Sequence, residues 1–186
     1  MLTSFLTGFA VLMAYFIISA ATALVIRHFV SLHDEVFRKI LHLILLGSLP
    51  VFLLAFERWW MAVVASLLFV VIEFPVLALG ERIDGYSELL IERKGGEVKH
   101  SLVVVFFMYA LMIGICWGWL GQPWLALASV YAWGFGDAAA ALVGKRYGSH
   151  FLGGRTIEGR KSVEGTLAMF AVSFVTVLAV LVVHAS

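Results

Sequence analysis

Cysteine and charged residues are scarce in this sequence of 186 residues. Its single cysteine, Cys116, excludes an intrachain disulfide framework and a metal site built from several thiolates. Charged residues make up 13% of the chain and leave a formal net charge of +1, and we expect no nucleic-acid partner. Hydrophobic residues make up 62%, with a mean hydropathy of +1.01. Such a chain is too apolar for an ordinary soluble domain, which indicates an integral membrane protein.

The sequence signatures of common soluble nucleotide and metal sites are also missing. There is no GxxxxGK(S/T) loop, no GxGxxG following a strand, no HExxH and no CxxC. A P-loop or dinucleotide-binding domain is therefore excluded. Any nucleotide site in this chain must be built from helix ends and loops.

Six apolar stretches are long enough to cross the ~30 Å hydrocarbon core of a bilayer as helices. We predict an all-α membrane protein with about six transmembrane helices in a single domain, residues 1–186. The first stretch lacks a positively charged n-region and is longer than a signal-peptide core, so we expect a retained helix. The predicted spans cover residues 4–26, 40–56, 59–80, 102–120, 123–143 and 163–184.

Lysine and arginine are distributed unequally between the connections. Twelve of the 13 lie in residues 27–39, 81–101 and 144–162, and only Arg58 lies in the short turns on the opposite side. The positive-inside rule places the three charged connections in the cytoplasm. We predict that both termini are non-cytoplasmic and that the active site is at the cytoplasmic face. The membrane would be the cytoplasmic membrane of a bacterium, or the endoplasmic reticulum or plastid membrane of a eukaryote.

Two acids lie inside apolar stretches, where a charge is costly and is by default a sign of function. Glu73 and Asp137 each lie about two helical turns before the predicted cytoplasmic end of their span, and His42 lies in the first turn of the second span. We predict that these three residues are catalytic and converge on one shallow pocket. Structural alternatives are a partner or kink role for Glu73 near Pro75 and a helix-end hydrogen bond for His42.

Small residues recur every four positions at Gly136, Ala140, Gly144 and Gly148. This spacing is typical of a close helix-packing face, within one chain or between two, so a homo-oligomer is one possible outcome. The segment continues into basic residues suited to phosphate oxygens, which favours an anion site. These are Lys145, Arg146, Arg155, Arg160 and Lys161.

The middle charged connection contains Gly95-Gly96 between charged residues of both signs. Glycine lets backbone amides approach an anion, lysine supplies positive charge, and carboxylates bind the Mg²⁺ that accompanies a triphosphate. The alternative is a solvated loop that faces anionic lipids. The charged residues around this glycine pair are Glu92, Arg93, Lys94, Glu97 and Lys99.

Three segments resemble the motifs of the polyprenol kinase family, which includes dolichol kinases, phytol kinases and CTP-dependent diacylglycerol kinases. The family's R-K-x-x-H is matched by Arg38-Lys39 and His42. Its G-D-x-x-A-x-x-x-G-x-x-(F/Y)-G and K-(S/T)-x-E-G-(S/T) motifs are matched by Gly136-Asp137, Ala140, Gly144 and Tyr147-Gly148, and then by Lys161-Ser162 and Glu164-Gly165-Thr166. The resemblance extends from about residue 36 to 170. The insert GGRTIEGR between the last two motifs departs from the family pattern and leaves the roles of its arginines open.

The resemblance implies a kinase that transfers a phosphoryl group from CTP, with Mg²⁺, to a membrane isoprenoid alcohol or to diacylglycerol. Asp137 would hold the metal or accept the alcohol proton, with Glu92 and Glu97 as further metal ligands, and His42 would orient the acceptor. The expected nucleotide contacts are Arg38, Lys39, Glu92, Lys94, Gly95, Gly96, Lys99, Gly136, Lys145, Lys161, Ser162, Glu164 and Gly165.

Two other functions fit parts of the pattern. A cytidylyltransferase acting on a lipid phosphate would use the same triphosphate and metal, but its K-D, H-G-G and D-R segments are not found in this sequence. A transport or scaffold protein could use Glu73 and Asp137 as an ion path. Transport predicts acids spread through the depth of the bilayer, whereas both acids are predicted near one face.

Overall fold

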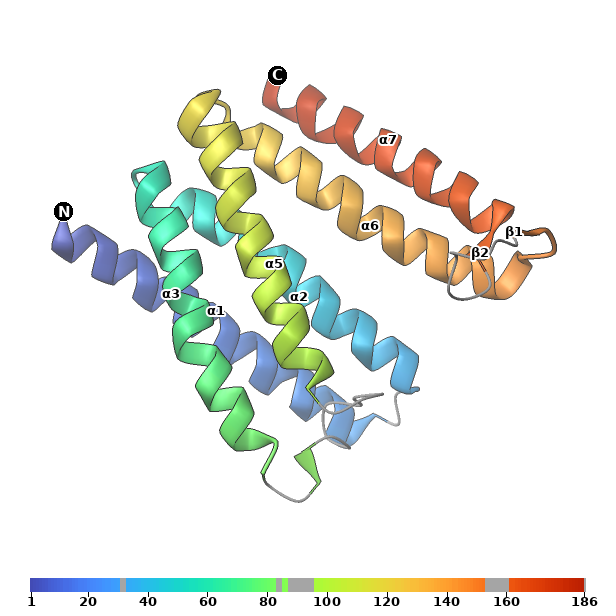
Figure 1. The fold of residues 1–186 in the computed structure, drawn as a ribbon, viewed down its shortest axis with the longest axis horizontal. Coiled ribbons are helices and arrows are strands. Elements are labelled where there is room, and N and C mark those ends of the chain that lie inside the picture. The colour runs from blue at the N-terminus through green and yellow to red at the C-terminus, as the bar shows by residue number, and fades with distance from the viewer. Residues whose placement is uncertain (31–32, 83–84, 87–95, 153–160, 186) are drawn as a thin grey trace. The chain divides into compact units, whose positions relative to one another are not determined.

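The computed structural model describes residues 1–30, 33–82, 85–86, 96–152 and 161–185. These residues form helices and one two-stranded sheet (Figure 1). Six helices are long and apolar enough to cross a membrane, which confirms the predicted all-helical membrane class. The chain forms two compact units, Met1–Pro123 and Trp124–Ser186, and each is described by itself. The orientation of the termini and the single-domain assignment stay predictions.

The first unit contains four membrane-length helical segments. They are α1 (Leu2–Phe29), α2 (Asp34–Ala55), α3 (Trp59–Gly80) and α5 (Glu97–Met112), which continues into a π-helical turn, η1 (Ile113–Trp119). The second unit contains α6 (Pro123–Tyr147), a hairpin of β1 (Phe151–Leu152) and β2 (Lys161–Ser162), and α7 (Val163–Ala185).

Several helices extend beyond the apolar spans predicted for them, and the longest extensions are in three of them. The second begins at Asp34 and not at residue 40, the fourth begins at Glu97 and not at 102, and the fifth ends at Tyr147 and not at 143. Hydropathy marks the part of a helix that lies in hydrocarbon, but charged residues continue the same backbone hydrogen bonds into the interface. At the start of α5, Gly96 has a φ of +80°, a left-handed conformation that glycine adopts without strain. The predicted connections 27–39, 81–101 and 144–162 are therefore partly helical.

Aromatic rings from all four helices form the core of the first unit. The ring centroid of Phe69 on α3 lies 4.6 Å from that of Phe16 on α1 and 4.5 Å from that of Phe106 on α5. Phe52 on α2 lies 6.0 Å from Phe106. Offset and edge-to-face aromatic pairs of this kind add to the packing of their apolar surface. Figure 1 shows the resulting arrangement, with α3 and α5 side by side.

Tyrosine hydroxyls link these helices through polar contacts. Tyr109 on α5 donates a hydrogen bond to the backbone oxygen of Leu45 on α2 at 2.7 Å, and Tyr15 on α1 donates to Ile44 at 2.8 Å. Side-chain hydrogen bonds between helices help to hold membrane bundles together. Both bonds end on consecutive carbonyl groups of α2, so α2 is held from two sides at the same depth.

Replacing Tyr109 by Phe should lower the free energy of unfolding by about 1 kcal/mol, because one buried hydrogen bond is lost while the ring is kept. Tyr109 is fully buried. The change is measured as a shift of the unfolding transition in detergent. Tyr147→Phe is the matched control, since Tyr147 is 62% exposed. Equal transitions for the two variants would contradict a stabilising role for the Tyr109 hydroxyl.

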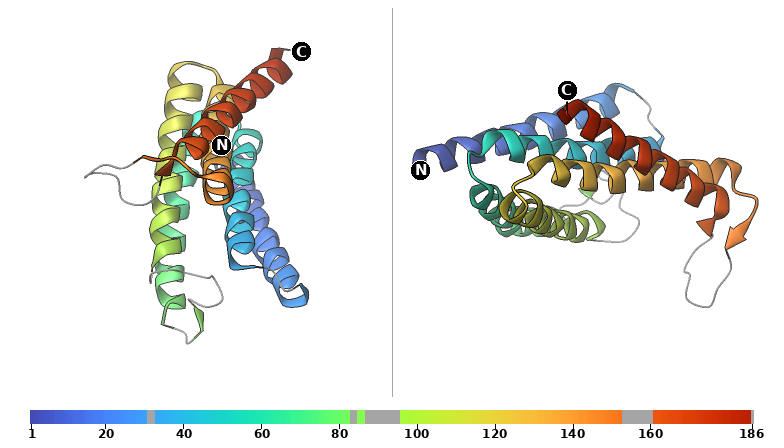
Figure 2. Two further views of the ribbon diagram at one scale, coloured as in Figure 1. Left: turned by 90° about the vertical axis from the view of Figure 1, so that its right-hand side faces the viewer. Right: turned by 90° about the horizontal axis from the view of Figure 1, so that it is seen from above.

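In the second unit, α6 and α7 lie side by side and are joined through the hairpin (Figures 1 and 2). The hairpin is antiparallel, with Phe151 paired to Ser162 and Leu152 to Lys161. Farther along the helices, Ser173 on α7 donates a hydrogen bond to the backbone oxygen of Ala132 on α6 at 2.7 Å. The hairpin therefore connects α6 to α7, and the Ser173 hydrogen bond links the two helices farther along.

Candidate functional site

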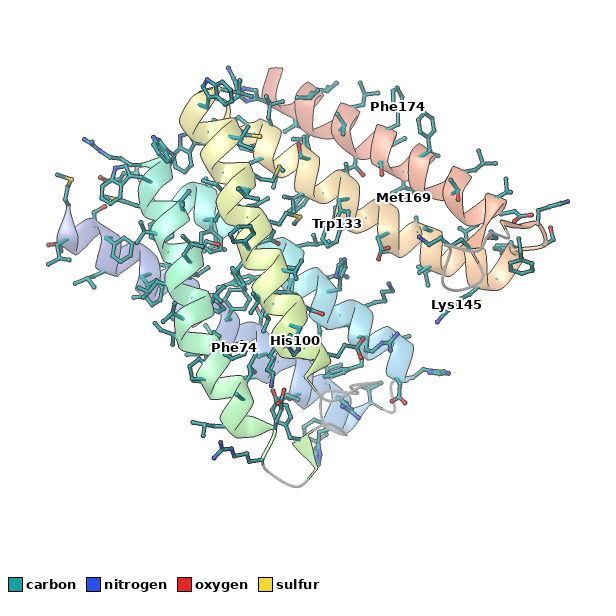
Figure 3. All side chains as sticks on the ribbon, viewed as in Figure 1. Phe74, His100, Trp133, Lys145, Met169 and Phe174 are labelled. Carbon is teal, nitrogen blue, oxygen red and sulfur yellow. The ribbon has the colours of Figure 1, made fainter. Side chains whose placement is uncertain are left out.

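The small residues predicted as a packing face lie in the contact between α6 and α7. A Cβ atom added at Gly136 would overlap the Ser173 hydroxyl and lie 3.2 Å from Cγ of Met169. Figure 3 shows Met169 on the side of α7 that faces α6, and Phe174 on the opposite side. Gly136 thus makes room for α7. Its predicted contact with the nucleotide stays a prediction.

Gly165 brings the two C-terminal motifs together. A Cβ atom at this position would lie 2.8 Å from the backbone oxygen of Ala140 and 3.3 Å from Cα of Gly144. Helix α7 therefore begins directly against the small face of α6, within one chain. Only glycine at position 165 allows this approach, which gives a physical reason for the glycine of the K-(S/T)-x-E-G-(S/T) motif.

Ser162 ends the hairpin and caps α7. Its hydroxyl accepts a hydrogen bond from the backbone N–H of Gly165 at 3.1 Å, which is the usual arrangement for a serine N-cap. Its side chain is packed against Gly144 and Gly148, and the residue is 4% exposed. Ser162 and Gly165 thus have structural roles in the described residues, and nucleotide binding by either stays a prediction.

Glu164 is engaged by the turn that precedes β1. The Ser149 hydroxyl donates to Oε1 of Glu164 at 2.6 Å, and Nδ1 of His150 lies 2.8 Å from the same oxygen. The backbone N–H of His150 donates to that oxygen as well, at 3.2 Å. All three contacts are to Oε1, whereas among the described residues Oε2 is approached only by the backbone N–H of His150, at 3.4 Å. The turn thus engages one oxygen of this carboxylate, and the predicted nucleotide contact of Glu164 stays a prediction.

Sequence reasoning did not single out Ser149 or His150 as site residues. Fourteen positions separate His150 from Glu164, a spacing without meaning in a helix or a strand. The two residues meet only because the hairpin returns the chain to the end of α6. The one signal available was their position between the two matched motifs.

Basic residues surround this turn. Lys145 and Lys161 are both exposed, and Figure 3 shows Lys145 projecting from the last turns of α6. Arg146 lies next to it, with its guanidinium 5.5 Å from the centroid of the Tyr147 ring. The end of the second unit therefore presents positive charge suited to an anion. Arg155 and Arg160 lie outside the described residues.

Asp137 lies on α6 beside Gly136, and its side chain is exposed. A turn of about 100° separates successive residues of a helix, so Asp137 points to one side of the direction in which Gly136 meets Met169. Because α6 continues to Tyr147, the acid lies ten residues, or about 15 Å, before the helix end. The acid therefore lies almost three turns from the helix end, and its predicted depth of about two turns before the end of the apolar span stays a prediction.

The catalytic candidates of the first unit lie on α2 and α3. His42 and Glu73 are both half-buried, as are Arg38 and Lys39. Since α2 begins at Asp34, His42 lies in the third turn of the helix and not in the first. Lys39 and His42 are three residues apart, so they share one face of α2. The predicted convergence of His42 and Glu73 with Asp137 stays a prediction.

Lys99, predicted to bind phosphate, forms an ion pair in the first unit. Its Nζ atom lies 2.5 Å from Oε2 of Glu81 and 5.6 Å from the centroid of the Phe74 ring. Glu81 was not identified from the sequence, because it precedes Lys99 by 18 residues and no local pattern relates positions so far apart. A phosphate at Lys99 would have to share the ammonium group with this carboxylate.

The remaining candidates of the middle connection differ in exposure, and some lie outside the described residues. Gly96 is buried at the start of α5, and its carbonyl oxygen lies 2.6 Å from Nδ1 of His100. Figure 3 shows His100 and Phe74 on the neighbouring helices α5 and α3. Glu97 is exposed. Glu92, Lys94 and Gly95 lie outside the described residues.

The chemistry of Asp137 fits Mg²⁺. Among the described residues there is no cluster of three or more His, Cys, Asp or Glu side chains placed for a metal. Magnesium in phosphoryl-transfer sites is usually held by one or two carboxylates, with water and phosphate oxygens completing its shell. An exposed carboxylate such as Asp137 is a suitable ligand of that kind.

Comparison with known proteins finds a relative that aligns over 143 residues. The chain is similar to a phytol kinase. This relative comes from Synechocystis sp., is 35% identical, and the aligned part covers 75% of this chain and 56% of the phytol kinase. The chain thus spans a little over half the length of that relative. No family model and no solved structure matches the chain. The similarity to the phytol kinase supports the resemblance to polyprenol and phytol kinases seen in the motifs.

Proposed function

We propose that this chain is a membrane lipid kinase that transfers the γ-phosphate of CTP to the hydroxyl of an isoprenoid alcohol. The observation that carries the proposal is the packing of Gly165 against Ala140 and Gly144, which joins the two C-terminal motifs in one unit. The 35% identity to a phytol kinase supports the same activity. Phytol is therefore the first acceptor to test, ahead of geranylgeraniol, longer polyprenols, dolichol and diacylglycerol.

In the proposed reaction the alcohol oxygen bonds to the γ-phosphorus of CTP, the bond from that phosphorus to the β-phosphate oxygen breaks, and CDP leaves. The alcohol proton is released. Such a transfer depends on alignment and charge neutralisation more than on covalent chemistry by the protein. Asp137 would stand at the reacting end, as a ligand of the Mg²⁺ that neutralises the phosphates or as the acceptor of the proton.

The two substrates would reach the site from different phases. The lipid alcohol enters from the bilayer with its hydroxyl at the interface, and CTP enters from the cytoplasm. Exposed Lys145 and Lys161 would meet the phosphates, with Arg38, Lys39 and Lys99 as candidates in the first unit. His42 would orient the acceptor, and Glu92 and Glu97 stay proposed as further metal ligands.

Labelled CTP tests this proposal directly. The purified full-length chain is incubated in detergent or vesicles with phytol, Mg²⁺ and CTP labelled at either the γ- or the α-phosphate. Label from the γ-position should appear in the lipid fraction, and label from the α-position should not. Competition with unlabelled ATP compares the two donors, and omission of the lipid is the control.

Other outcomes of the same experiment identify other functions. Transfer of the α-label to a lipid phosphate would identify a cytidylyltransferase and contradict the kinase. Label in no member of the lipid panel would also contradict it and favour a transport or scaffold role.

A further inference from the structure

The second unit contains a histidine, His150, whose ring and backbone form hydrogen bonds and which has no role in the proposed reaction. His150 lies in the turn between α6 and β1, and its side chain is 81% exposed. Two hydrogen bonds hold the backbone of His150. Its N–H donates to Glu164, and its carbonyl oxygen accepts from the N–H of Val163 at 2.9 Å. The ring is held as well, through the contact of Nδ1 with Glu164.

The carboxylate determines which ring nitrogen of His150 carries the proton in the neutral imidazole. An ionised carboxylate can only accept hydrogen bonds, so the Nδ1 atom, 2.8 Å from Oε1 of Glu164, must be the donor. Ser149 strengthens this arrangement, since its hydroxyl donates to the same Oε1 and its oxygen lies 3.1 Å from Nδ1. The Nε2 atom is then left as a hydrogen-bond acceptor on an exposed ring.

The position of His150 along the unit decides which part of a nucleotide it can meet. Asp137 is about 15 Å of helix from the end of α6, and His150 lies three residues beyond that end. A residue so far from Asp137 cannot touch the reacting γ-phosphate that Asp137 serves. An extended nucleoside triphosphate that lies along α6 with its γ-phosphate at Asp137 would bring its nucleoside half toward the turn that contains His150.

We infer that Nε2 of His150 accepts a hydrogen bond from a donor group on the nucleoside half of the bound nucleotide, and that Glu164 is the positioning residue that makes Nε2 an acceptor. This inference rests on the proposed function. Two donors share the required chemistry, the exocyclic amine of cytosine and a ribose hydroxyl. Cytosine presents an amine at the position where uracil presents an oxygen, so an acceptor at that place favours CTP over UTP.

The test compares the wild-type chain with His150→Asn. Asparagine can keep an N–H near the position of Nδ1, so the tether to Glu164 is retained, and it places no atom at Nε2. Binding of CTP should weaken about tenfold and KM for CTP should rise by the same factor, which is the effect of losing one hydrogen bond. The value of kcat should stay within about twofold, since the reacting end is untouched.

Nucleotide analogues identify the donor. If the amine is bound, the wild type prefers CTP over UTP and His150→Asn loses that preference. If a ribose hydroxyl is bound, the wild type prefers CTP over 2′- or 3′-deoxy-CTP, and the variant loses this preference instead. Either result supports the inference. Glu164→Gln should weaken the same preference, because an amide no longer forces Nδ1 to be the donor.

Three results would overturn the inference. The first is unchanged CTP binding in His150→Asn, and the second is a fall in kcat of that variant with KM unchanged. The third is an equal loss of CTP binding in His184→Asn, the matched change at the opposite end of α7, where the ring centroid lies 5.3 Å from that of Trp124. Melting in detergent identifies variants that fail to fold, and for those His150→Gln, which places an amide near Nε2, is compared. Equilibrium dialysis measures CTP binding directly, and γ-label transfer measures the kinase reaction. If the wild type transfers the γ-label and the variants bind CTP as the wild type does, the inference about His150 is rejected and the kinase proposal stands.

Discussion

Asp137→Asn should lower turnover by at least about a thousandfold while leaving the protein folded. Asparagine has the shape of aspartate but carries no charge, so it neither neutralises Mg²⁺ nor accepts a proton. Each factor of ten in rate corresponds to about 1.4 kcal/mol of barrier, and the loss of a metal ligand or base costs several kcal/mol. The exposed position of Asp137 on α6 means that the amide fits the same space.

The measurement is γ-phosphate transfer from CTP to phytol by purified wild-type and variant chains, together with their unfolding transitions in detergent. Asp34→Asn is the matched control, since Asp34 is exposed at the start of α2 and has no proposed role in the reaction. Near-normal turnover in Asp137→Asn would remove the acid from the reacting end. In that case the distance between Asp137 and the end of α6 would no longer place His150 at the nucleoside.

Gly165→Ala should destabilise the second unit by about 2–3 kcal/mol, the cost of forcing an extra methyl group into a closely packed contact. The new Cβ atom would lie 2.8 Å from the backbone oxygen of Ala140 and 3.3 Å from Cα of Gly144. Backbone atoms cannot rotate away as a side chain can, so α7 must shift from α6. Kinase activity should fall with stability, because the two motifs are then separated.

Gly114→Ala is the matched control for this variant, since it is the same chemical change in another membrane-length helix. Its added Cβ would meet only Cγ2 of Val63, at the ordinary contact distance of 4.0 Å. We expect an unchanged or slightly higher unfolding temperature for it, because alanine favours helix more than glycine. If Gly165→Ala and Gly114→Ala melt together, the close approach at Gly165 is not a source of stability.

These predictions separate two kinds of residue within the two C-terminal motifs. Gly136, Gly144 and Gly165 match the family pattern because two helices must approach closely, and a change at these positions is expected to act through stability. Asp137 is proposed to match it for chemistry, and a change there is expected to act on rate alone. Glu164 belongs to neither group, since its carboxylate contacts His150 and its inferred role is to position that ring.

Hydropathy was sufficient to predict the six helices, because about twenty apolar residues in a row can satisfy their backbone in a membrane only as a helix. The ends of the helices could not be predicted equally well. Charged residues at Asp34, Glu97 and Lys145 are helical, although they lie outside the apolar spans. Nothing in hydropathy distinguishes a charged residue in the last turn of a helix from one in a loop.

The sequence alone determined the membrane class and the motifs, and it selected Asp137 as the candidate acid, because these depend on composition and on local order along the chain. Tertiary structure decided which side chains are available for ligands. It gave Lys99 a partner in Glu81, placed Ser162 beneath the start of α7, and turned Glu164 toward His150. Such pairs form between residues far apart in the chain, and their geometry depends on how closely two helices approach, which at α6 and α7 is set by glycine.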